Sequence, residues 1–171
     1  MSIENVRYRP EIRFAASDPC RQMEILMSTV QDVLAAKGSA VHTIDVSATV
    51  LVATRAMNQR RIGALVVTDA GRIVGMFTER DVLHRIVACE LSPSAVPVSQ
   101  VMTREVIFCR PDMDLDEVSR IIRDRRIRHL PVCNDAGQLL GLISIGDINA
   151  HHASSQEAHI HFLHDYCFGR A

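Results

Sequence analysis

Residues 126–147 read RIRHLPVCNDAGQLLGLISIGD, and residues 61–81 read RIGALVVTDAGRIVGMFTERD, which is nearly the same pattern. Arg61 aligns with Arg126 at an offset of 65 residues, and after one inserted residue Asp81 aligns with Asp147 at an offset of 66. A period this long exceeds that of a solenoid repeat. The sequence therefore predicts a duplicated fold of two small halves that pack on each other.

Each copy contains the same predicted series of elements. In the first copy, residues 41–45 and the apolar runs 62–67 and 73–77 indicate strands, with the turn TDAG between the last two. Ser47 and Thr78 are suitable caps for two helices, the second over residues 79–88. In the second copy the strands are expected at 105–110, 130–133 and 139–143, with Asp112 or Asp114 and then Ser144 starting the helices. Each half therefore reads β-α-β-β-α, an α/β (α+β) architecture.

The rest of the chain forms extensions around these halves. Residues 22–36 have largely helical apolar spacing, and Gly38 is a suitable stop. A proline-containing linker leads to a short helical turn at 99–102, and the histidine-rich end has the pattern of one more amphipathic helix. We divide the chain into an N-terminal arm (1–27), the two halves (28–90 and 91–152) and a C-terminal helical tail (153–171).

The composition narrows the classes of function. Nineteen basic and 20 acidic residues give a net charge of −1, so no overall field attracts nucleic acid or an anionic membrane. Low aromatic content and the lack of tryptophan disfavour a platform for single-stranded nucleic acid. No apolar run approaches the ~20 residues that span a bilayer, and there is no signal-peptide layout. Five scattered cysteines are typical of reduced thiols, so we expect a soluble cytoplasmic protein.

With two complete copies in view, the chain resembles a tandem pair of CBS (cystathionine β-synthase) domains. The residues that carry the resemblance are RHLPV and GLISIGD in the second copy and GMFTERD in the first. The style is that of stand-alone bacterial CBS-pair proteins and of the regulatory insert of inosine monophosphate dehydrogenase. The resemblance implies pseudo-two-fold packing of the halves, a homodimer, and a regulatory rather than enzymatic role that signals to an unidentified effector protein.

The resemblance also implies adenosine-containing ligands, such as AMP, ADP, ATP, NAD or S-adenosylmethionine, in the cleft between the halves. In the family, the strands of one half join the Ser/Thr-x-x-Asp segment of the other. Carried over, a first site would combine His42, Ile62, Gly63, Ala64, Ser144, Gly146 and Asp147. A second site would combine Ile107, Ile127, Arg128, His129, Thr78, Arg80 and Asp81.

The residue types suit such ligands chemically. A carboxylate at a helix start, such as Asp81 or Asp147, accepts hydrogen bonds from ribose hydroxyls. Free amides at the helix start and guanidinium groups favour phosphate. Arg80, Arg128 and His129 make the second site the stronger phosphate candidate. Gly63 and Ala64, where the other copy has Arg and His, leave the first site roomier and less charged. The two sites need not share a ligand.

Other interpretations stand beside these. Asp81 and Asp147 are also suited to cap helices, and Arg128 with His129 to cover a sheet edge. Arginines crowd residues 120–128 as either a solvated helix face or a local anion site. His151, His152, His159, His161 and His164 form either a metal-responsive tail or a helix that packs on a second copy. A ligand-independent dimerisation scaffold is a further alternative. No catalytic motif, catalytic residue or resident metal site is recognised, so we expect no enzyme activity.

Overall fold

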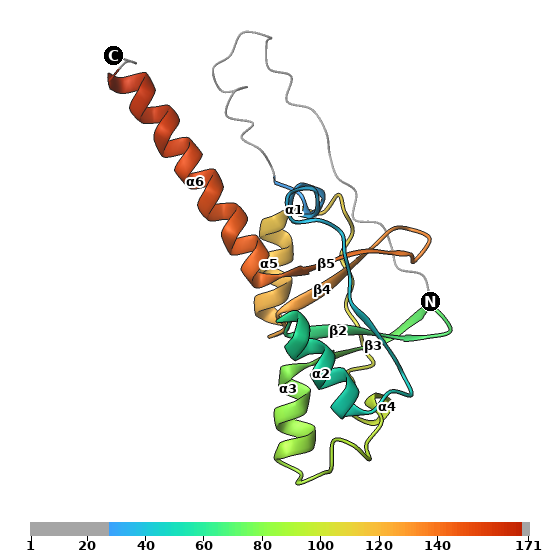
Figure 1. The fold of residues 1–171 in the computed structure, drawn as a ribbon. Helices are drawn as coiled ribbons and strands as arrows, with labels where there is room; N and C mark the ends of the chain where they lie inside the picture. Colours follow the sequence, from blue (N-terminus) through green and yellow to red (C-terminus); the bar gives the residue numbers. More distant parts are fainter. Residues whose placement is uncertain (1–27, 169–171) are drawn as a thin grey trace.

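The computed structural model describes residues 28–168, and it describes side chains for residues 28–157. Two small α/β halves lie one above the other (Figure 1). The first half contains β1 (Thr43–Asp45), α2 (Val50–Arg60), β2 (Ala64–Asp69), β3 (Arg72–Thr78), α3 (Glu79–Asp81) and the π-helical η2 (Val82–Val87). The second contains α5 (Leu115–Asp124), β4 (His129–Cys133), β5 (Leu139–Ser144) and the start of α6 (Ile145–Phe168). The predicted α/β fold of two halves is confirmed.

Among the described residues, the two sheets contain the expected hairpins, but the first sheet has three strands and the second has only two. In the first half β1 pairs in parallel with β2, and β2 pairs antiparallel with β3. In the second half β4 and β5 form a two-stranded antiparallel sheet. The turns contain Gly71 and Gly137 at φ of 80° and 74°, which L side chains rarely adopt. The TDAG and NDAG turn predictions are therefore confirmed.

The strand predicted at residues 105–110 is wrong, because only a single bridge forms there, between Cys109 and Val132. Its counterpart in the first half is held partly by the amide of Val66, which donates to the carbonyl of His42 over 3.2 Å. The residue aligned with Val66 is Pro131, which has no backbone N–H. The hydrogen bond that would extend a strand toward Ile107 is therefore unavailable.

Helix caps follow the sequence with two corrections. The helix predicted over residues 22–36 is α1 (Val30–Lys37), capped by Thr29 and ended by Gly38, and residues 22–27 lie outside the described chain. Thr49 caps α2 in place of Ser47, whose amide and hydroxyl both donate to Asp45 at 2.8 and 2.5 Å. Asp114 caps α5, as one of two predicted candidates. The final helix of the repeat and the expected tail helix are one continuous helix, α6.

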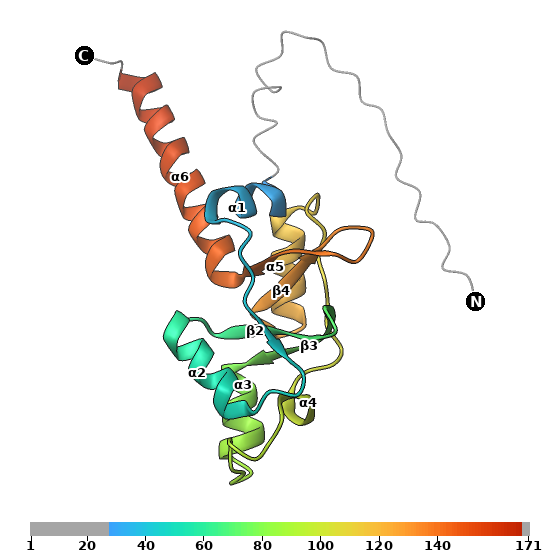
Figure 2. The same ribbon diagram turned by 45° about the vertical axis from the view of Figure 1, so that its right-hand side comes forward.

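Each half is completed by a short helix that comes from elsewhere in the chain. Val30, Val33 and Leu34 of α1 are buried in a core with residues of α5, β4 and β5. Val98 and Val101 of α4 (Val98–Val101) are buried in the other core, with α2, β2 and β3. Both views show α1 beside the second half and α4 beside the first (Figures 1 and 2). The segment leading into each half therefore packs on the opposite half.

Two glycines at aligned positions permit this exchange. A Cβ on Gly141 of β5 would lie 2.6 Å from Cδ2 of Leu34 in α1. A Cβ on Gly75 of β3 would lie 2.6 Å from the sulfur of Met102 and 2.9 Å from the carbonyl oxygen of Thr103. Real Cβ atoms do not approach other atoms this closely, so both positions require glycine, which has no side chain. Each glycine marks the place where the exchanged segment crosses the sheet.

The two halves meet through a small third core. Ala64, Val66 and Met76 of the first half are buried against Leu139 and Leu142 of the second. The expectation that each half covers an apolar sheet face of the other is thus confirmed. Among the described helices, none has the length and apolar character needed to cross a membrane.

Candidate functional site

Within the described part of the chain, three cavities lie where the halves meet, and two of them contain predicted site residues. The cavity that we call the first site has a volume of about 400 Å³ and is lined by Lys37, Ala40, His42, Arg61, Ile62, Gly63, Ala64, His129, Leu142, Ser144 and Asp147. The second site has a volume of about 340 Å³ and is lined by Met76, Thr78, Arg80, Asp81, His84, Arg85, Thr103, Glu105, Val106, Ile107, Arg125, Arg126, Ile127, Arg128 and His129. Each of these two sites is bounded by strands of one half and a helix start of the other.

The structure brings the predicted sets together almost completely. All seven residues proposed for the second site line that cavity. Six of the seven proposed for the first site line the other cavity, and the exception is Gly146, which is exposed on the first turn of α6. The grouping is crosswise because the strands of each half face the helix start of the other half.

Asp81 and Asp147 hold their helix starts in the same way. In the second site, Oδ2 of Asp81 accepts from the amide of Thr78 at 2.8 Å and from its hydroxyl at 2.7 Å. In the first site, Oδ2 of Asp147 accepts from the amide and the hydroxyl of Ser144, both at 2.7 Å. The capping interpretation is therefore present in the structure. In each case the cap uses Oδ2 of the carboxylate, so Oδ1 takes no part in these hydrogen bonds.

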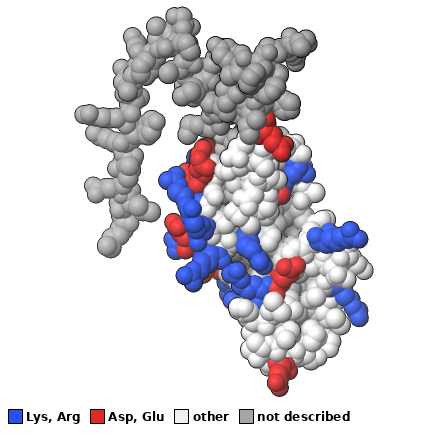
Figure 3. Space-filling model, turned by 90° about the vertical axis from the view of Figure 1, so that its left-hand side faces the viewer, with Lys and Arg blue, Asp and Glu red and all other residues white. Residues whose placement is uncertain are grey.

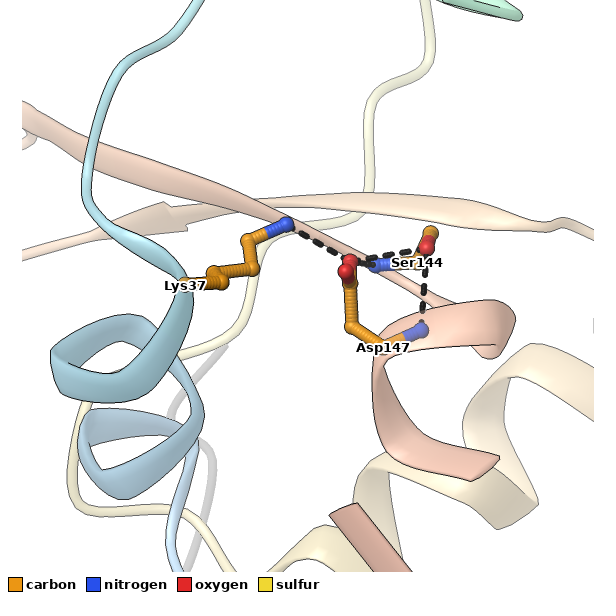
Figure 4. Close-up of polar contacts among 3 residues, drawn as sticks. All are labelled: Lys37, Ser144 and Asp147. Carbon is orange, nitrogen blue, oxygen red and sulfur yellow. Dashed lines mark hydrogen bonds and ion pairs between the residues drawn. The ribbon is translucent and has the colours of Figure 1, made fainter. Parts of the chain in front are cut away.

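The two carboxylates differ in their cationic neighbours. Nζ of Lys37, at the end of α1, lies 2.6 Å from Oδ2 of Asp147 (Figure 4). Nη1 of Arg85 lies 3.1 Å from Oδ1 of Asp81 and also donates to the carbonyl of Val101 at 2.6 Å. Asp81 is only 6% exposed, so its neighbours limit how a ligand reaches it. Oδ1 of Asp147 takes part in none of the three bonds that the carboxylate accepts from Lys37 and Ser144.

Electrostatics keep Asp147 ionised. Burial acts to raise the pKa of Asp147, but the hydrogen bonds from Lys37 and Ser144 together outweigh it, so the pKa lies below its usual value of 3.8. An ionised carboxylate accepts hydrogen bonds and donates none, which suits it to a pair of vicinal hydroxyls. Asp147 therefore presents an acceptor to the first cavity at neutral pH.

His129 forms a wall shared by the two sites, since it lines both cavities. Burial lowers the pKa of His129, and the positive charge of Arg128 lowers it further, while Asp147 and Glu79 act in the opposite direction. The imidazole is therefore neutral at pH 7, and it adds no fixed charge to either site.

The second site is rich in arginine. Arg80, Arg85, Arg125, Arg126 and Arg128 line it, and Nη1 of Arg80 donates to the carbonyl of Arg126 across the two halves at 2.8 Å. Arg128 pairs only loosely with Glu79, at 3.9 Å, and both side chains are well exposed. Basic side chains also gather in the middle of one face of the molecule, with acidic ones among them (Figure 3). This arrangement leaves guanidinium groups available for an anion.

Sequence reasoning missed several of these residues. The first site contains Lys37 and Arg61, which the sequence did not point to, but it has fewer charged lining residues than the second site and a larger volume, as expected. Lys37 could not be found by spacing, because 110 residues separate it from Asp147. Three members of the arginine run 120–128 do line the second site, whereas Arg120 and Arg123 face a separate hollow between α5 and α6.

Within the described side chains, no group of three or more histidine, cysteine, aspartate or glutamate residues is placed to hold a metal ion. Nε2 of His152 lies 3.7 Å from Asp116. The side chains of His159, His161 and His164 lie outside the described part of the chain. The metal-responsive interpretation of the tail therefore stays a prediction.

Comparisons with known proteins agree on the family. The CBS domain family matches residues 29–88 and 98–152. The CBS domain-containing protein YhcV of Bacillus subtilis is 32% identical over 132 residues, covering 77% of this chain and 91% of that protein. Inosine-5'-monophosphate dehydrogenase of Thermoplasma acidophilum is 35% identical over 108 residues, which is 63% of this chain and 21% of the enzyme.

Solved structures show the same fold. A CBS-domain containing protein from Agrobacterium tumefaciens superposes with a TM-score of 0.70 at 35% identity, covering 73% of this chain and 99% of that one. The CBS domain pair of protein MJ0100, solved in complex with 5'-methylthioadenosine and S-adenosyl-L-methionine, has a TM-score of 0.66 at 22% identity, with 74% and 97% coverage. With two matched copies that pack crosswise around a pair of cavities, this chain belongs to the CBS domain family and is a tandem CBS pair.

Proposed function

We propose that this CBS pair is a sensor of adenosine nucleotides, which binds AMP, ADP, ATP or NAD between its halves and signals to an effector protein. The observation that carries the proposal is the pair of carboxylates, Asp81 and Asp147, which lie at aligned helix starts and face strands of the opposite half. A diol-accepting carboxylate beside cationic side chains is complementary to ribose with phosphate. The adenosine ligands of the MJ0100 complex support the same class of ligand.

Binding can change the relation of the halves only if a ligand favours one arrangement over another. Each site draws residues from both halves, so a ligand in either cavity contacts both. A nucleotide therefore has a physical means of biasing their relative orientation. The proposal assigns no bond-breaking step to the chain.

The test is ligand-dependent thermal stabilisation of the full chain. At a ligand concentration of 100 Kd, the free energy of unfolding should rise by about 2.7 kcal/mol for one site. AMP, ADP, ATP, NAD and S-adenosylmethionine are compared, and Asp147→Asn and Asp81→Asn should each remove part of the effect. If none of the five ligands changes the melting temperature of the wild type, the sensor proposal fails.

The chain contains a matched control for these variants. Oδ2 of Asp32 accepts from the amide and the hydroxyl of Thr29 at 2.7 and 2.8 Å, which is the same capping arrangement. Asp32 lines neither site. Asp32→Asn should therefore lower the stability of the unliganded protein while leaving ligand-induced stabilisation intact, which separates loss of a cap from loss of a binding group.

Dimerisation is a second function that a specific observation favours. Val52, Leu83 and Val87, on helices α2 and η2 of the first half, are 51%, 59% and 62% exposed. Burying such side chains against a second copy would be favourable, by about 25 cal/mol per Å² of apolar surface. A homodimer through the first half should dissociate when Leu83 is replaced by Asp. Sedimentation velocity that finds Leu83→Asp and the wild type in the same oligomeric state would contradict it.

A further inference from the structure

Lys37 stands apart from every other cation of the protein. It is the only lysine in the 171-residue sequence, beside 18 arginines. It is the last residue of α1, immediately before Gly38, and it reaches Asp147 over 2.6 Å across a separation of 110 residues. The side chains of Lys37 and Asp147 are 33% and 24% exposed, so the pair is partly shielded from water (Figure 4).

The ion pair leaves binding capacity on both partners. An ammonium group has three N–H donors, and the bond to Asp147 uses one of them. Asp147 uses Oδ2 for Lys37 and Ser144, so Oδ1 is not engaged by these contacts. A ligand can thus place a hydroxyl pair on Asp147 and an anionic group on Lys37 at the same time.

The charge of the ligand decides how well this arrangement is used. An uncharged nucleoside meets a carboxylate that is already paired with Lys37, and it offers the ammonium group only neutral hydrogen-bond acceptors. A phosphate group supplies a second anion for Lys37, through a charge-assisted hydrogen bond that is stronger than a neutral one. Arg61, which lines the same cavity, adds a further positive charge.

We propose that Lys37 is the specificity-determining residue of the first site, selecting an adenosine ligand that carries phosphate over the uncharged nucleoside. This rests on the proposed function, because it takes the first site as an adenosine site. The second site has no equivalent of this pair, since Arg85 there approaches Asp81 through the other carboxylate oxygen, Oδ1. The selectivity that depends on Lys37 is therefore a property of the first site, whereas phosphate in the second site would be bound by the arginines that line it.

The single lysine allows occupancy of the first site to be read directly. AMP oxidised with periodate carries a 2',3'-dialdehyde in place of the ribose diol. Its aldehyde carbon should form an imine with Nζ of Lys37, releasing water, and borohydride then reduces the imine to a stable amine. Peptide mapping distinguishes Lys37 from the N-terminal amine. Competing AMP should protect Lys37 at a concentration about tenfold below that needed for adenosine, which is the ratio expected for one charge-assisted hydrogen bond.

Variants complete the test. Affinities for AMP and adenosine are measured by equilibrium dialysis in an Arg128→Ala background, which weakens the second site at an exposed side chain. Lys37→Met should lose most of the preference for AMP, and Lys37→Arg should restore it. Equal protection by AMP and adenosine, or an unchanged preference in Lys37→Met, overturns the role of Lys37 alone. If neither compound protects Lys37, the role of Lys37 is overturned, and the proposed function is overturned as well only if none of the five ligands changes the melting temperature.

Discussion

At the scale of single residues, His129 lines both candidate sites between the halves, and its pKa is shifted by its surroundings. Its folded-state pKa lies below the ordinary value of 6.5, because burial and then Arg128 disfavour the imidazolium. Asp147, with a pKa below 3.8, remains charged throughout the physiological range. The two groups that face the first site therefore respond to pH in different windows.

The direction of the His129 effect can be worked out. Below pH 6.5 the unfolded chain takes up a proton at this residue while the folded chain does not yet do so, and the unfolded state gains relative stability. The stability contributed by the neutral imidazole is complete above 6.5 and is lost as the pH falls toward the folded-state pKa. Wild-type unfolding free energy should fall by up to about 1.4 kcal/mol per pH unit there.

The measurement is urea unfolding between pH 7 and pH 5 for the wild type and His129→Gln. The variant should show a shallower dependence on pH in this range, because it lacks the titrating group. An NMR titration of the His129 ring gives the folded-state pKa independently. Equal slopes for the two proteins, or a ring that titrates above 6.5, would contradict the assignment.

At the scale of elements, α1 lies so close to β5 that position 141 has no room for a side chain. Adding a methyl group at Gly141 places it against Leu34, whose side chain is buried and cannot move freely. Gly141→Ala should lower the free energy of unfolding by about 1–3 kcal/mol, as overpacking of a core does.

Gly146→Ala is the matched control, since a Cβ there meets only the hydroxyl of Ser144 at 3.5 Å, and the change lies within helix α6. Its stability should be unchanged or higher by up to about 1 kcal/mol. Chemical denaturation of both variants provides the comparison. A Gly141→Ala protein as stable as Gly146→Ala would show that α1 does not press on β5 in solution.

Part of the fold and of the site could be predicted from local sequence patterns. The hairpins, their glycine turns and the helix starts at Thr78 and Ser144 follow from local patterns, and so do the site residues that those patterns contain. The strand at 105–110 failed because one proline, Pro131, lies in its partner. Ser47 was misassigned because its hydroxyl binds Asp45 instead of the helix start. Lys37 entered the first site through packing between distant segments, which no local spacing reports.

At the scale of the whole molecule, the exchange of α1 and α4 means that the residues of each core do not form one of the two repeats read from the sequence. Helix α1 packs in the core of the second half, and α4 packs in the core of the first. Residues 28–90 contain α1 but lack α4, so their core would miss Val98, Val101 and Met102. Residues 39–104 contain every element that packs around that core. We predict that residues 39–104 form the more stable isolated fragment, although residues 28–90 correspond to the half read from the repeat.

The comparison requires only circular dichroism and thermal unfolding of the two fragments at equal concentration. Residues 39–104 should unfold cooperatively, and residues 28–90 should show little cooperative transition. The reverse ranking would mean that α4 contributes less to the first core than its burial indicates. In the full chain, the exchanged helices should make both halves unfold in one transition.

The long helix α6 connects the first site to a point far from it, so a rotation at the site displaces the far end of the helix. It starts directly after Ser144, carries Asp147 in its first turn and projects away from both halves (Figure 1). Its 24 residues give a lever arm of about 36 Å at 1.5 Å per residue. If a ligand turns its base by about 5°, the far end moves by about 3 Å over this length. A small rotation at the cavity therefore produces a displacement at the far end of α6 that is large enough to make or break side-chain contacts there.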